Sequence, residues 1–449
     1  MTGSWLLVAP APLAGEPDQV TLVAARAASE RRGADDSLVV GMLEGDLASQ
    51  HAVETELARE GLDRSVLGRD AFVERVRDTE ARRRDELVAA LVSEGIVVDG
   101  EAGRTGREEV VRAARVAFVR LFDAGLLERA ERIVDVCPRC NTVVEPSDAA
   151  SVSTDVVRYS LVMGGSETPE LIADMIDLEL LPGVVAVAVP PDHEAVGATV
   201  RVPLGLDVPV IADDATLAPW LVTAGHNAVA LDFARHHNLV PITVLDRTGA
   251  VALEGPLTGL ARFAARAAAS DLVAAEGAVR EQTDDAVDQL RCGRCATTLV
   301  PLLGWHWFLR TRELEVAAAD ALREGAFVLE DVAARDSFVD RAERSDSWCL
   351  SHQVWAGEAV PAARCLDCGQ LAVTAEPTSS CGKCMGELTP TDDVLDSRFI
   401  AAVWPLTIEG GGAVTLFASQ QAIIEFVLPA AALGLKLAGA VPFAEVVVV

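Results

Sequence analysis

Eight of the nine cysteines stand in four C-x-x-C pairs, and this spacing limits what the chain can fold into more than any other feature does. The pairs are Cys137/Cys140, Cys292/Cys295, Cys365/Cys368 and Cys381/Cys384, and only Cys349 is left over. Such pairs are poor disulfide candidates in a reducing compartment, whereas two pairs together supply the four thiolates of a closed tetrahedral zinc site. The eight thiolates therefore predict two structural Zn²⁺ sites.

The two predicted sites make different demands on the fold. The pairs at 365/368 and 381/384 are close in sequence, with glycine in or beside each pair, so they can form one small ribbon. The pairs at 137/140 and 292/295 are far apart, so a shared zinc ion requires the segment between them to be an insertion whose ends return to one place. The alternative is thioredoxin-like redox chemistry, but the sequence around the pairs lacks the βαβ setting that this needs.

Length and composition indicate a multidomain α/β protein. A chain of 449 residues is too long for one ordinary core, so two or three domains are expected. Half of the residues are hydrophobic and only 4% are aromatic, and alanine and valine are abundant in helix-like and strand-like stretches.

The charge balance is unfavourable for nucleic acid. The 68 Asp and Glu outnumber the 38 Lys and Arg, giving a net charge of -30. This repels phosphate backbones unless the basic residues share one face. Arginines do gather in two places, but acidic residues are interspersed among them, as on a solvated helix face. The clusters are Arg75, Arg77, Arg82, Arg83 and Arg84, and then Arg112, Arg115 and Arg120.

Neither end of the sequence resembles a targeting or membrane segment. Residues 1–12 lack a basic segment followed by an apolar core and a cleavage site, so a cytoplasmic location is expected. Residues 413–449 are apolar but are interrupted by charged residues and prolines, which favours buried helix and strand over a membrane span.

Apolar periodicity predicts an α/β domain that is split by an insertion. Residues 5–9 and 38–42 read as strands that flank a helix at 20–31, which is the start of a nucleotide-binding pattern. Further helices are predicted at 51–59, 70–76, 109–130, 313–323 and 338–344. Between residues 150 and 288 the runs are β-rich, with strands predicted at 156–163, 184–190, 199–203, 208–212 and 242–245.

Several motifs make the chain similar to the valyl-tRNA synthetases. The segment with EGL at 60–62, LGR at 67–69 and FVERV at 72–76 gives moderate support. The runs CPRCNT at 137–142 and WCLSHQVW at 348–355 decide the resemblance, and DVLD at 393–396 matches a strand of the family. Cys349 is then a family position outside the zinc ligands.

The predicted insertion resembles the editing domain of these synthetases. The matching runs are VAVAV at 185–189, PVIAD at 209–213, TAGH at 223–226 and RHHNL at 235–239. The resemblance implies a class I Rossmann-type catalytic core split by a β-rich editing-like insertion, with zinc knuckles. The implied domains are residues 1–149, the first half of the core with the first knuckle; 150–290, the insertion; and 291–449, the second half.

The departures from the family lie at the positions that would carry aminoacylation. The family's His-x-Gly-His signature, which holds ATP phosphates, is missing, and the corresponding stretch places Glu16 where phosphate should approach. GMLEGD at 41–46 replaces the run that positions the amino acid and the adenylate in the family. In the valine pocket, Arg398 stands where the family has one tryptophan, and Val427 stands where it has a second. The sequence ends before the expected Lys-Met-Ser-Lys-Ser loop. ATP binding and valine selectivity are therefore both in doubt.

The editing residues are also altered. Thr223 survives, but an ungapped comparison places Ala230, Asn227 and Leu221 where the family has two aspartates and a lysine. A residual editing site would use Thr223, His226 and Asp232, provided that the loop is shifted so that Asp232 takes over the lost role. The family's Thr-Thr-Arg-Pro-Glu loop is matched only loosely by residues 165–170.

Three functions follow from this comparison. The first is a zinc-stabilised paralogue that is inactive in aminoacylation and acts by binding or regulation. The second is a residual aminoacyl-tRNA deacylase, and the third is a valine-tRNA ligase that works with a separately encoded partner. The acidic surface, the apolar residues 446–449 and a possible free sheet edge leave room for a protein partner or a dimer, whereas tRNA is not an expected partner.

Overall fold

The computed structural model describes residues 4–14, 18–164, 169–408 and 413–449, so Glu16 and the loop at 165–168 lie outside the described residues. The chain divides into two compact units. The first unit comprises Met1–Arg129 with His306–Val449, and the second comprises Ala130–Trp305. One unit is thus discontinuous in sequence and the other is a single insertion into it. The domain boundaries at 149/150 and 290/291 remain a prediction.

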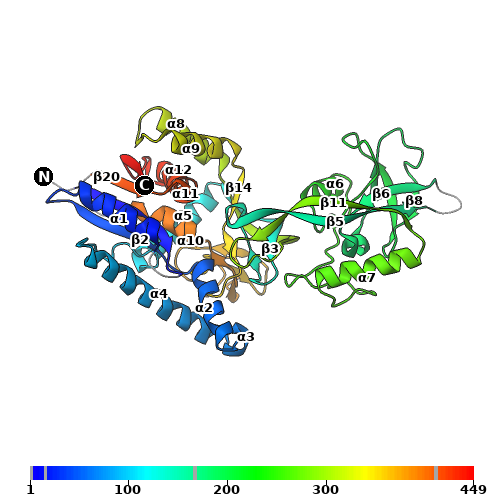
Figure 1. Ribbon diagram of the computed structural model, residues 1–449, viewed down its shortest axis with the longest axis horizontal. Helices are drawn as coiled ribbons and strands as arrows, with labels where there is room; N and C mark the ends of the chain where they lie inside the picture. Colours follow the sequence, from blue (N-terminus) through cyan, green and yellow to red (C-terminus); the bar gives the residue numbers. More distant parts are fainter. Residues whose placement is uncertain (1–3, 15–17, 165–168, 409–412) are drawn as a thin grey trace. The chain divides into compact units, whose positions relative to one another are not determined.

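A parallel five-stranded sheet forms the centre of the first unit, as expected of a Rossmann-type core (Figure 1). Residues Trp5 to Val8 pair in parallel with Ser37 to Val40 on one side and with residues 414–417 on the other. The strands, in their order across the sheet, are β13 (Val328–Leu329), β21 (Glu445–Val448), β20 (Val414–Ala418), β1 (Trp5–Pro12) and β2 (Ser37–Leu43).

Both faces of this sheet are covered, because successive side chains of a strand point to opposite faces. Leu6 and Val8 enter a core shared with helices α1 (Gln19–Arg31) and α4 (Arg69–Ser93). Leu7 enters a larger core on the other face, which it shares with five helices: α5 (Glu108–Asp123), α8 (Arg312–Arg323), α9 (Val332–Arg344), α10 (Ser397–Val403) and α12 (Leu428–Ala438). A strand buried on both faces reads as a continuous apolar run, which is why β1 and β2 could be predicted from sequence.

The remaining helices of the first unit surround this sheet. They are α2 (Leu47–Arg59), α3 (Arg64–Leu67), α5 (Glu108–Asp123), α8 (Arg312–Arg323), α9 (Val332–Arg344), α10 (Ser397–Val403), α11 (Gln420–Ala422) and α12 (Leu428–Ala438). The helix predicted at 109–130 was too long. It ends at Asp123 because Gly125 adopts a φ of 67°, a left-handed conformation that terminates helices, and the chain then enters β3 (Leu127–Cys137).

The second unit is built mainly from strands. A ribbon of β5 (Ala149–Met163) and β11 (Val279–Cys292) carries β6 (Leu171–Met175) at its side. A separate sheet has the order β10 (Trp220–Leu221), β7 (Val187–Val189), β9 (Asp207–Ala212) and β8 (Thr199–Arg201). The helices are α6 (Ala228–His236) and α7 (Arg262–Ala275).

Two expectations for strands were wrong. Residues 242–245 contribute only an isolated bridge between Leu245 and Val251. The strands β11 and β12 (Val300–Arg310) were not predicted at all. In β11 the cause is composition, since this strand carries six charged residues and lies at the edge of its sheet, where an apolar alternation is not needed.

The free edge of β2 is partly closed by the chain itself. The Met42 N–H donates to the Gly103 carbonyl over 2.8 Å, and the Thr105 N–H donates to the Met42 carbonyl over 3.0 Å. A glycine is required at 103, because a Cβ there would lie 1.8 Å from the Val40 carbonyl oxygen. At the other edge β13 has only two residues. The sheet therefore offers short edges for pairing with another chain.

One helical stretch, Gln420–Ala438, is long and apolar enough to span a membrane by length and composition. Core helices pass the same test. Every residue from Leu428 to Gly434 is buried, and the apolar ones belong to the larger core of the first unit. The packing matches the predicted buried helix.

A buried carboxyl group holds the turn after β2, and its ionisation should control stability. Glu80 is buried and accepts a hydrogen bond from the Gly45 N–H over 2.8 Å. Burial raises the pKa of Glu80 to about 8, with Asp46 and Glu44 adding to the effect. A carboxyl whose pKa rises on folding favours the folded state below its unfolded pKa, and that contribution is lost as the pH rises through about 8.

In the wild type we expect the free energy of unfolding to fall between pH 5 and pH 9 as Glu80 ionises. We expect Glu80→Gln to make this fall smaller by a few kcal/mol, since one unit of pKa shift corresponds to roughly 1.4 kcal/mol. Urea unfolding across this pH range measures the effect. Glu74→Gln, on the exposed face of the same helix, is the matched control and should keep the wild-type profile. Parallel profiles for wild type and Glu80→Gln would show that Glu80 does not titrate in this way.

Candidate functional site

All four cysteine pairs adopt the same turn. In each, the residue after the second cysteine donates its N–H to the carbonyl of the first, over 2.7 to 3.1 Å. That residue has a positive φ in every case: Asn141 (56°), Ala296 (57°), Gly369 (68°) and Met385 (63°). A left-handed alanine or methionine costs roughly 1 kcal/mol, so this geometry is imposed by the turn and not chosen by the residue. The turn directs both thiols of a pair to the same side.

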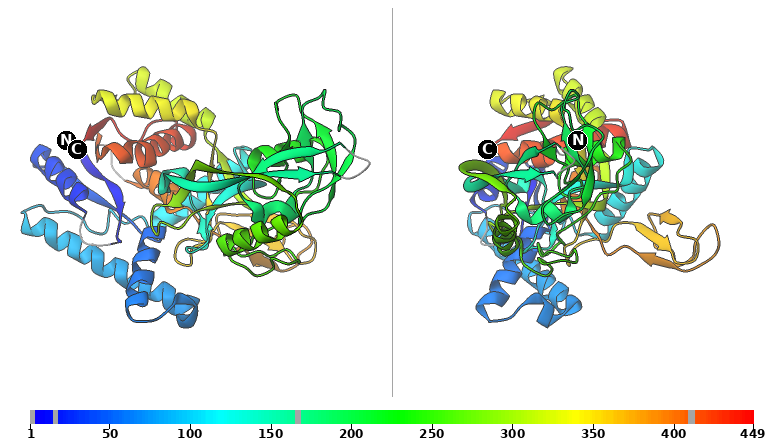
Figure 2. Two further views of the ribbon diagram at one scale, coloured as in Figure 1. Left: turned by 45° about the vertical axis from the view of Figure 1, so that its right-hand side comes forward. Right: turned by 90° about the vertical axis from the view of Figure 1, so that its right-hand side faces the viewer.

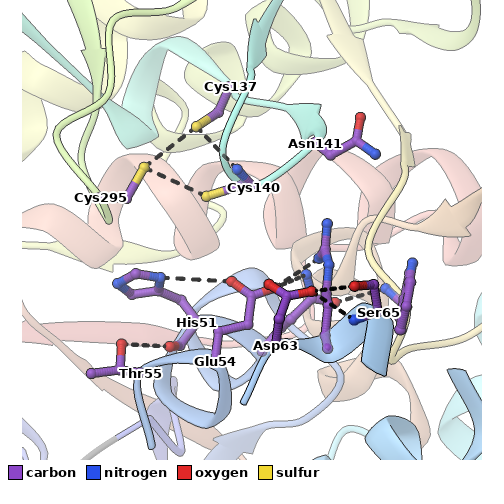
Figure 3. Close-up of polar contacts among 12 residues, drawn as sticks. His51, Glu54, Thr55, Asp63, Ser65, Cys137, Cys140, Asn141 and Cys295 are labelled. Carbon is purple, nitrogen blue, oxygen red and sulfur yellow. Dashed lines mark hydrogen bonds and ion pairs between the residues drawn. The ribbon is translucent and has the colours of Figure 1, made fainter. Parts of the chain in front are cut away.

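The first cysteine centre joins the two distant pairs. Figure 3 shows the thiols of Cys137, Cys140 and Cys295 directed toward one another. The Sγ–Sγ distances are 3.4 Å for Cys137–Cys295, 3.7 Å for Cys140–Cys295 and 4.0 Å for Cys140–Cys292. Four thiolates about 2.3 Å from one metal ion would be roughly 3.8 Å apart, whereas a disulfide needs about 2.05 Å. The sulfurs therefore fit a tetrahedral metal site.

The position of this centre follows from the ribbon of the second unit. Cys292 ends β11 and pairs with Ala149 at the start of β5, so the ribbon brings the two ends of residues 140–292 together. The topological prediction made from the cysteine spacing is thus confirmed.

The second cysteine centre lies in a three-stranded ribbon of the first unit. Its strands are β16 (Ala362–Cys365), β17 (Leu371–Val373) and β18 (Leu388–Pro390), and Figure 2 shows them as a narrow projection. The Sγ–Sγ distances are 3.4 Å for Cys365–Cys384 and 3.7 Å for Cys368–Cys381. In both centres all four sulfurs lie within 4.8 Å of one another, so each could hold a metal ion.

The crowded thiols of the first centre favour a cation. A hydrogen bond with Cys137 raises the pKa of the Cys140 thiol, whereas hydrogen bonds from Cys137 and Cys140 lower the pKa of Cys295. Thiols in such contact cannot all ionise unless a positive charge compensates them. A bound divalent ion would supply that charge.

His226, one of the three predicted editing residues, is fixed by the backbone. Its Nδ1 lies 2.8 Å from the Pro301 carbonyl oxygen, and its Nε2 accepts a hydrogen bond from the Val244 N–H over 2.8 Å. The ring is buried, and this burial lowers the pKa of His226 to about 4. Both nitrogens are thus occupied and the ring is neutral, which is the arrangement of a structural histidine.

The other editing positions do not converge with His226. Asp232 lies on the exposed side of α6, and Thr223 is half-buried. Within the described parts of the chain, no side-chain hydrogen bond joins Thr223, His226 and Asp232. Asn227 caps α6 by accepting from the Ala230 N–H over 3.0 Å, and Ala230 is packed in an apolar core with Val222 and Ala224. The position where the family has its aspartate is therefore part of the core.

The carboxyl edge of the parallel sheet is the place where α/β folds of this kind bind ligands, at the point where the strand order reverses. Here that point lies between β1 and β20. The helix that follows β1 begins with Asp18, whose carboxylate accepts hydrogen bonds from the Thr21 N–H and hydroxyl, each over 3.1 Å. The helix N-terminus, which would otherwise attract an anion, already holds the protein's own carboxylate.

A second internal carboxylate lies after β2. Glu44 accepts a hydrogen bond from Arg104 Nε over 2.9 Å and from the Gly106 N–H over 3.1 Å. Its side chain is 10% exposed, and Arg84 lies 3.8 Å away. The segment at 41–46 is therefore held by ion pairs within the first unit.

Two motifs of the resemblance, WCLSHQVW at 348–355 and DVLD at 393–396, meet in one polar cluster. The strands β15 (Ser351–His352) and β19 (Val394–Leu395) pair, and Asp396 accepts a hydrogen bond from Trp348 Nε1 over 2.9 Å. Arg398 lies 3.1 Å from the same carboxylate and His352 lies 3.4 Å from it. Burial alone would raise the pKa of Asp396, but Arg398 and His352 hold it well below its usual range.

The arginine cluster on α4 is largely neutralised by neighbouring acids. Arg75 pairs with Glu60, Arg82 with Glu56 and Glu86, and Arg83 and Arg84 lie within 4.0 Å of acidic groups. These arginines belong to a solvated network, as the interspersed acids had indicated.

Comparison with known proteins settles the family. The sequence model of the tRNA synthetases class I (I, L, M and V) matches residues 23–413. The chain belongs to this family. It is 32% identical to a valine-tRNA ligase of Geobacter sulfurreducens, over 81% of this chain and 43% of that protein. It is 31% identical to one from Streptomyces avermitilis, over 82% of this chain and 43% of that protein.

The chain thus spans less than half the length of these valine-tRNA ligases, and it is a valyl-tRNA synthetase-like member of the class I family. Among solved structures, it is similar to LeuRS in a complex with tRNA and LeuAMS from Agrobacterium radiobacter K84, with 12% identity and a TM-score of 0.46 over 99% of this chain and 64% of that one. A Mycobacterium tuberculosis methionyl-tRNA synthetase gives 10% identity and a TM-score of 0.47, over 99% and 56%. Scores of this size support no further argument.

Sequence reasoning did not single out two carboxylates near the carboxyl edge of the parallel sheet, Asp18 and Glu44. Asp18 and Glu44 could have been found, because an aspartate before an apolar helix is a capping signal and Glu44 falls in an altered motif. The pairing of Glu44 with Arg104 had no signal, since the two residues are distant in sequence and only the fold brings them together.

Two bound metal ions per chain are expected. Cys140→Ser should reduce the content to one and lower the unfolding temperature, because a three-thiolate set loses affinity and the ends of residues 140–292 lose their cross-link. Metal analysis and thermal unfolding measure both effects. Cys349→Ser, a buried cysteine outside both centres, should keep two ions; two ions in Cys140→Ser would remove Cys140 from the ligand set.

His226→Ala should destabilise the second unit by about 3 kcal/mol, because a buried N–H of Val244 and a buried carbonyl of Pro301 lose their partner. Because the pKa of His226 is depressed to about 4, its contribution is present above pH 6.5 and is lost as the pH falls through 4. Asp232→Asn, which is exposed, should change the free energy of unfolding by less than about 0.5 kcal/mol. If His226→Ala left the free energy of unfolding unchanged, that result would contradict the structural role of His226.

Proposed function

We propose that the protein is a zinc-stabilised class I synthetase paralogue that does not aminoacylate and that acts by binding a protein. The observation that carries this proposal is Asp18 at the N-terminus of α1. In an active class I enzyme this region receives ATP phosphates, and a carboxylate there repels them while using the hydrogen bonds that they would take. Glu44 lies after the neighbouring strand and is held by Arg104 and Arg84, so internal ion pairs occupy the segment that positions the adenylate in the family.

The altered valine pocket supports the same proposal. Arg398 stands where the family has a tryptophan, and it forms an ion pair with Asp396. A guanidinium in an amino-acid pocket repels the substrate's ammonium group and removes an apolar wall that a valine side chain would contact. The position of the second family tryptophan is Val427, which is fully buried in the core.

Zinc is the metal ion that we propose for both centres. Four thiolates at tetrahedral separations select Zn²⁺ over Mg²⁺ or Ca²⁺, which prefer oxygen ligands. With all four positions filled by cysteine, no open position remains for a substrate or water. The ion would therefore supply a cross-link and no catalytic step.

Charge favours a protein partner over tRNA. Residues 130–305 contain 11 arginines and no lysine against 24 Asp and Glu. An insertion with this excess of acid repels a phosphate backbone. In the described part of the insertion Thr223, His226 and Asp232 do not converge, so we expect no deacylation of mischarged tRNA. The cytoplasm is the proposed location.

Purified zinc-loaded protein should show no valine-dependent exchange of pyrophosphate into ATP, and titration with ATP or a non-hydrolysable valyl-adenylate analogue should give no heat. An active valine-tRNA ligase in the same assay provides the positive control. Robust exchange would sink the proposal and establish the ligase. A rate of Thr-tRNA deacylation above that of buffer would establish the residual editing activity instead.

A further inference from the structure

The two cysteine centres differ in their access to solvent. Three of the four cysteines in the first centre are buried, and Cys295 is partly buried. In the second centre Cys368 and Cys384 are exposed, while the other two are buried. The two centres have the same ligands and the same turn geometry, so access is the property that separates their reactivity toward molecules in solution.

We propose that the second centre is a site of oxidative modification, where a hydroperoxide attacks Cys368 or Cys384 and releases the metal ion, while the first centre keeps its ion. This proposal takes from the proposed function only that Zn²⁺ fills both centres. The exposed sulfurs are its entry points, because a hydroperoxide can approach them without any movement of the ribbon.

The surroundings of the exposed thiols leave them open. Leu366 and Met385, each next to a cysteine in the two turns, are 65% and 76% exposed. Lys383, one of only two lysines in the chain, lies between Cys381 and Cys384, and its backbone N–H lies 3.4 Å from the Cys381 sulfur. The sulfurs of Cys368 and Cys384 are therefore the ones that a molecule in solution can reach.

The geometry also selects which sulfurs would join. Each exposed sulfur has a buried partner from the other turn close to it, with Cys384 3.4 Å from Cys365 and Cys368 3.7 Å from Cys381. A disulfide requires about 2.05 Å, so a shift of under roughly 2 Å joins either pair. The products are therefore disulfides between the two turns, Cys365–Cys384 and Cys368–Cys381.

The chemistry balances with one hydroperoxide for each disulfide. The exposed thiolate attacks the outer peroxide oxygen, the O–O bond breaks, and the sulfur becomes a sulfenic acid while the peroxide is reduced to water or an alcohol. The buried partner thiolate then attacks this sulfur, the S–S bond forms, and the oxygen leaves as water after taking protons from solvent. The two sulfurs lose two electrons, which the peroxide accepts. The ion leaves because two of its four ligands are gone.

Exchange of the ion for two disulfides should loosen the ribbon and leave the rest of the first unit folded. The ribbon's own buried core consists of Cys365, Cys381 and Leu388, with Ala363 and Ala372 packed beside it. So small a core depends on the cross-link between the turns, and the disulfides replace the tetrahedral cross-link of the ion with one that requires the sulfurs to move. The larger core of the sheet includes Ala362 and contacts Leu371 and Val373 of the ribbon, but most of it comes from the sheet and its helices.

The test uses the full zinc-loaded chain, treated with hydrogen peroxide in the presence of a chromogenic zinc chelator. We expect one equivalent of zinc to leave roughly ten times faster or more than the second. Peptide mapping at that point should find the two disulfides between the turns, with the cysteines of the first centre still reduced. Hydrogen exchange should show lost protection over residues 362–390 alone.

A double substitution, Cys368→His with Cys384→His, keeps four zinc ligands but removes the exposed thiols. It should slow the fast phase to the rate of the first centre, and Cys349→Ser should leave both phases unchanged. Release of both ions at one rate, or disulfides within a turn such as Cys365–Cys368, would overturn the proposal. So would a second centre that holds no zinc before oxidation, while the pyrophosphate exchange assay would still decide the proposed function.

Discussion

The convergence of Cys137, Cys140, Cys292 and Cys295 is the constraint on which the organisation of the second unit depends. A two-stranded ribbon such as β5 and β11 is marginally stable in water, and here it has many charged residues and a long free edge. Its ends stay together because two turns, each with a left-handed residue, place four sulfurs at the spacing of a tetrahedral site. The same turn, repeated in the second centre, shows that this local geometry does not depend on its surroundings.

Internal ion pairs shape the first unit in a comparable way. The class I sheet, with its reversal of strand order, retains the place where such folds bind ligands. Two carboxylates follow the strands that end at this edge. Asp18, after β1, caps a helix, and Glu44, after β2, pairs with Arg104. Glu80 supports the following turn from a buried position. These contacts stabilise the first unit around the turns that follow β1 and β2.

Local patterns in the sequence were sufficient where the signal was carried by neighbouring residues. The first two strands of the parallel sheet, the helix between them and the grouping of the cysteines into two sets of four were predicted correctly. Prediction failed where tertiary context decided the outcome. The charged strand β11 has no apolar alternation, and the helix of residues 108–123 was extended too far because Gly125 was read as an interruption and not as its end.

The editing-like residues show the same division. Sequence placed Thr223, His226 and Asp232 within a few residues of one another, but only the fold shows that His226 is hydrogen-bonded to the backbone at Val244 and Pro301 and that Asp232 faces solvent. The sequence by itself determined the family, the presence of an insertion and the grouping of eight cysteines into two sets of four, because spacing and motifs are local properties of the chain. The tertiary structure alone decided which carboxylates meet which arginines and which thiols are open to solvent, because these depend on residues that only folding brings together.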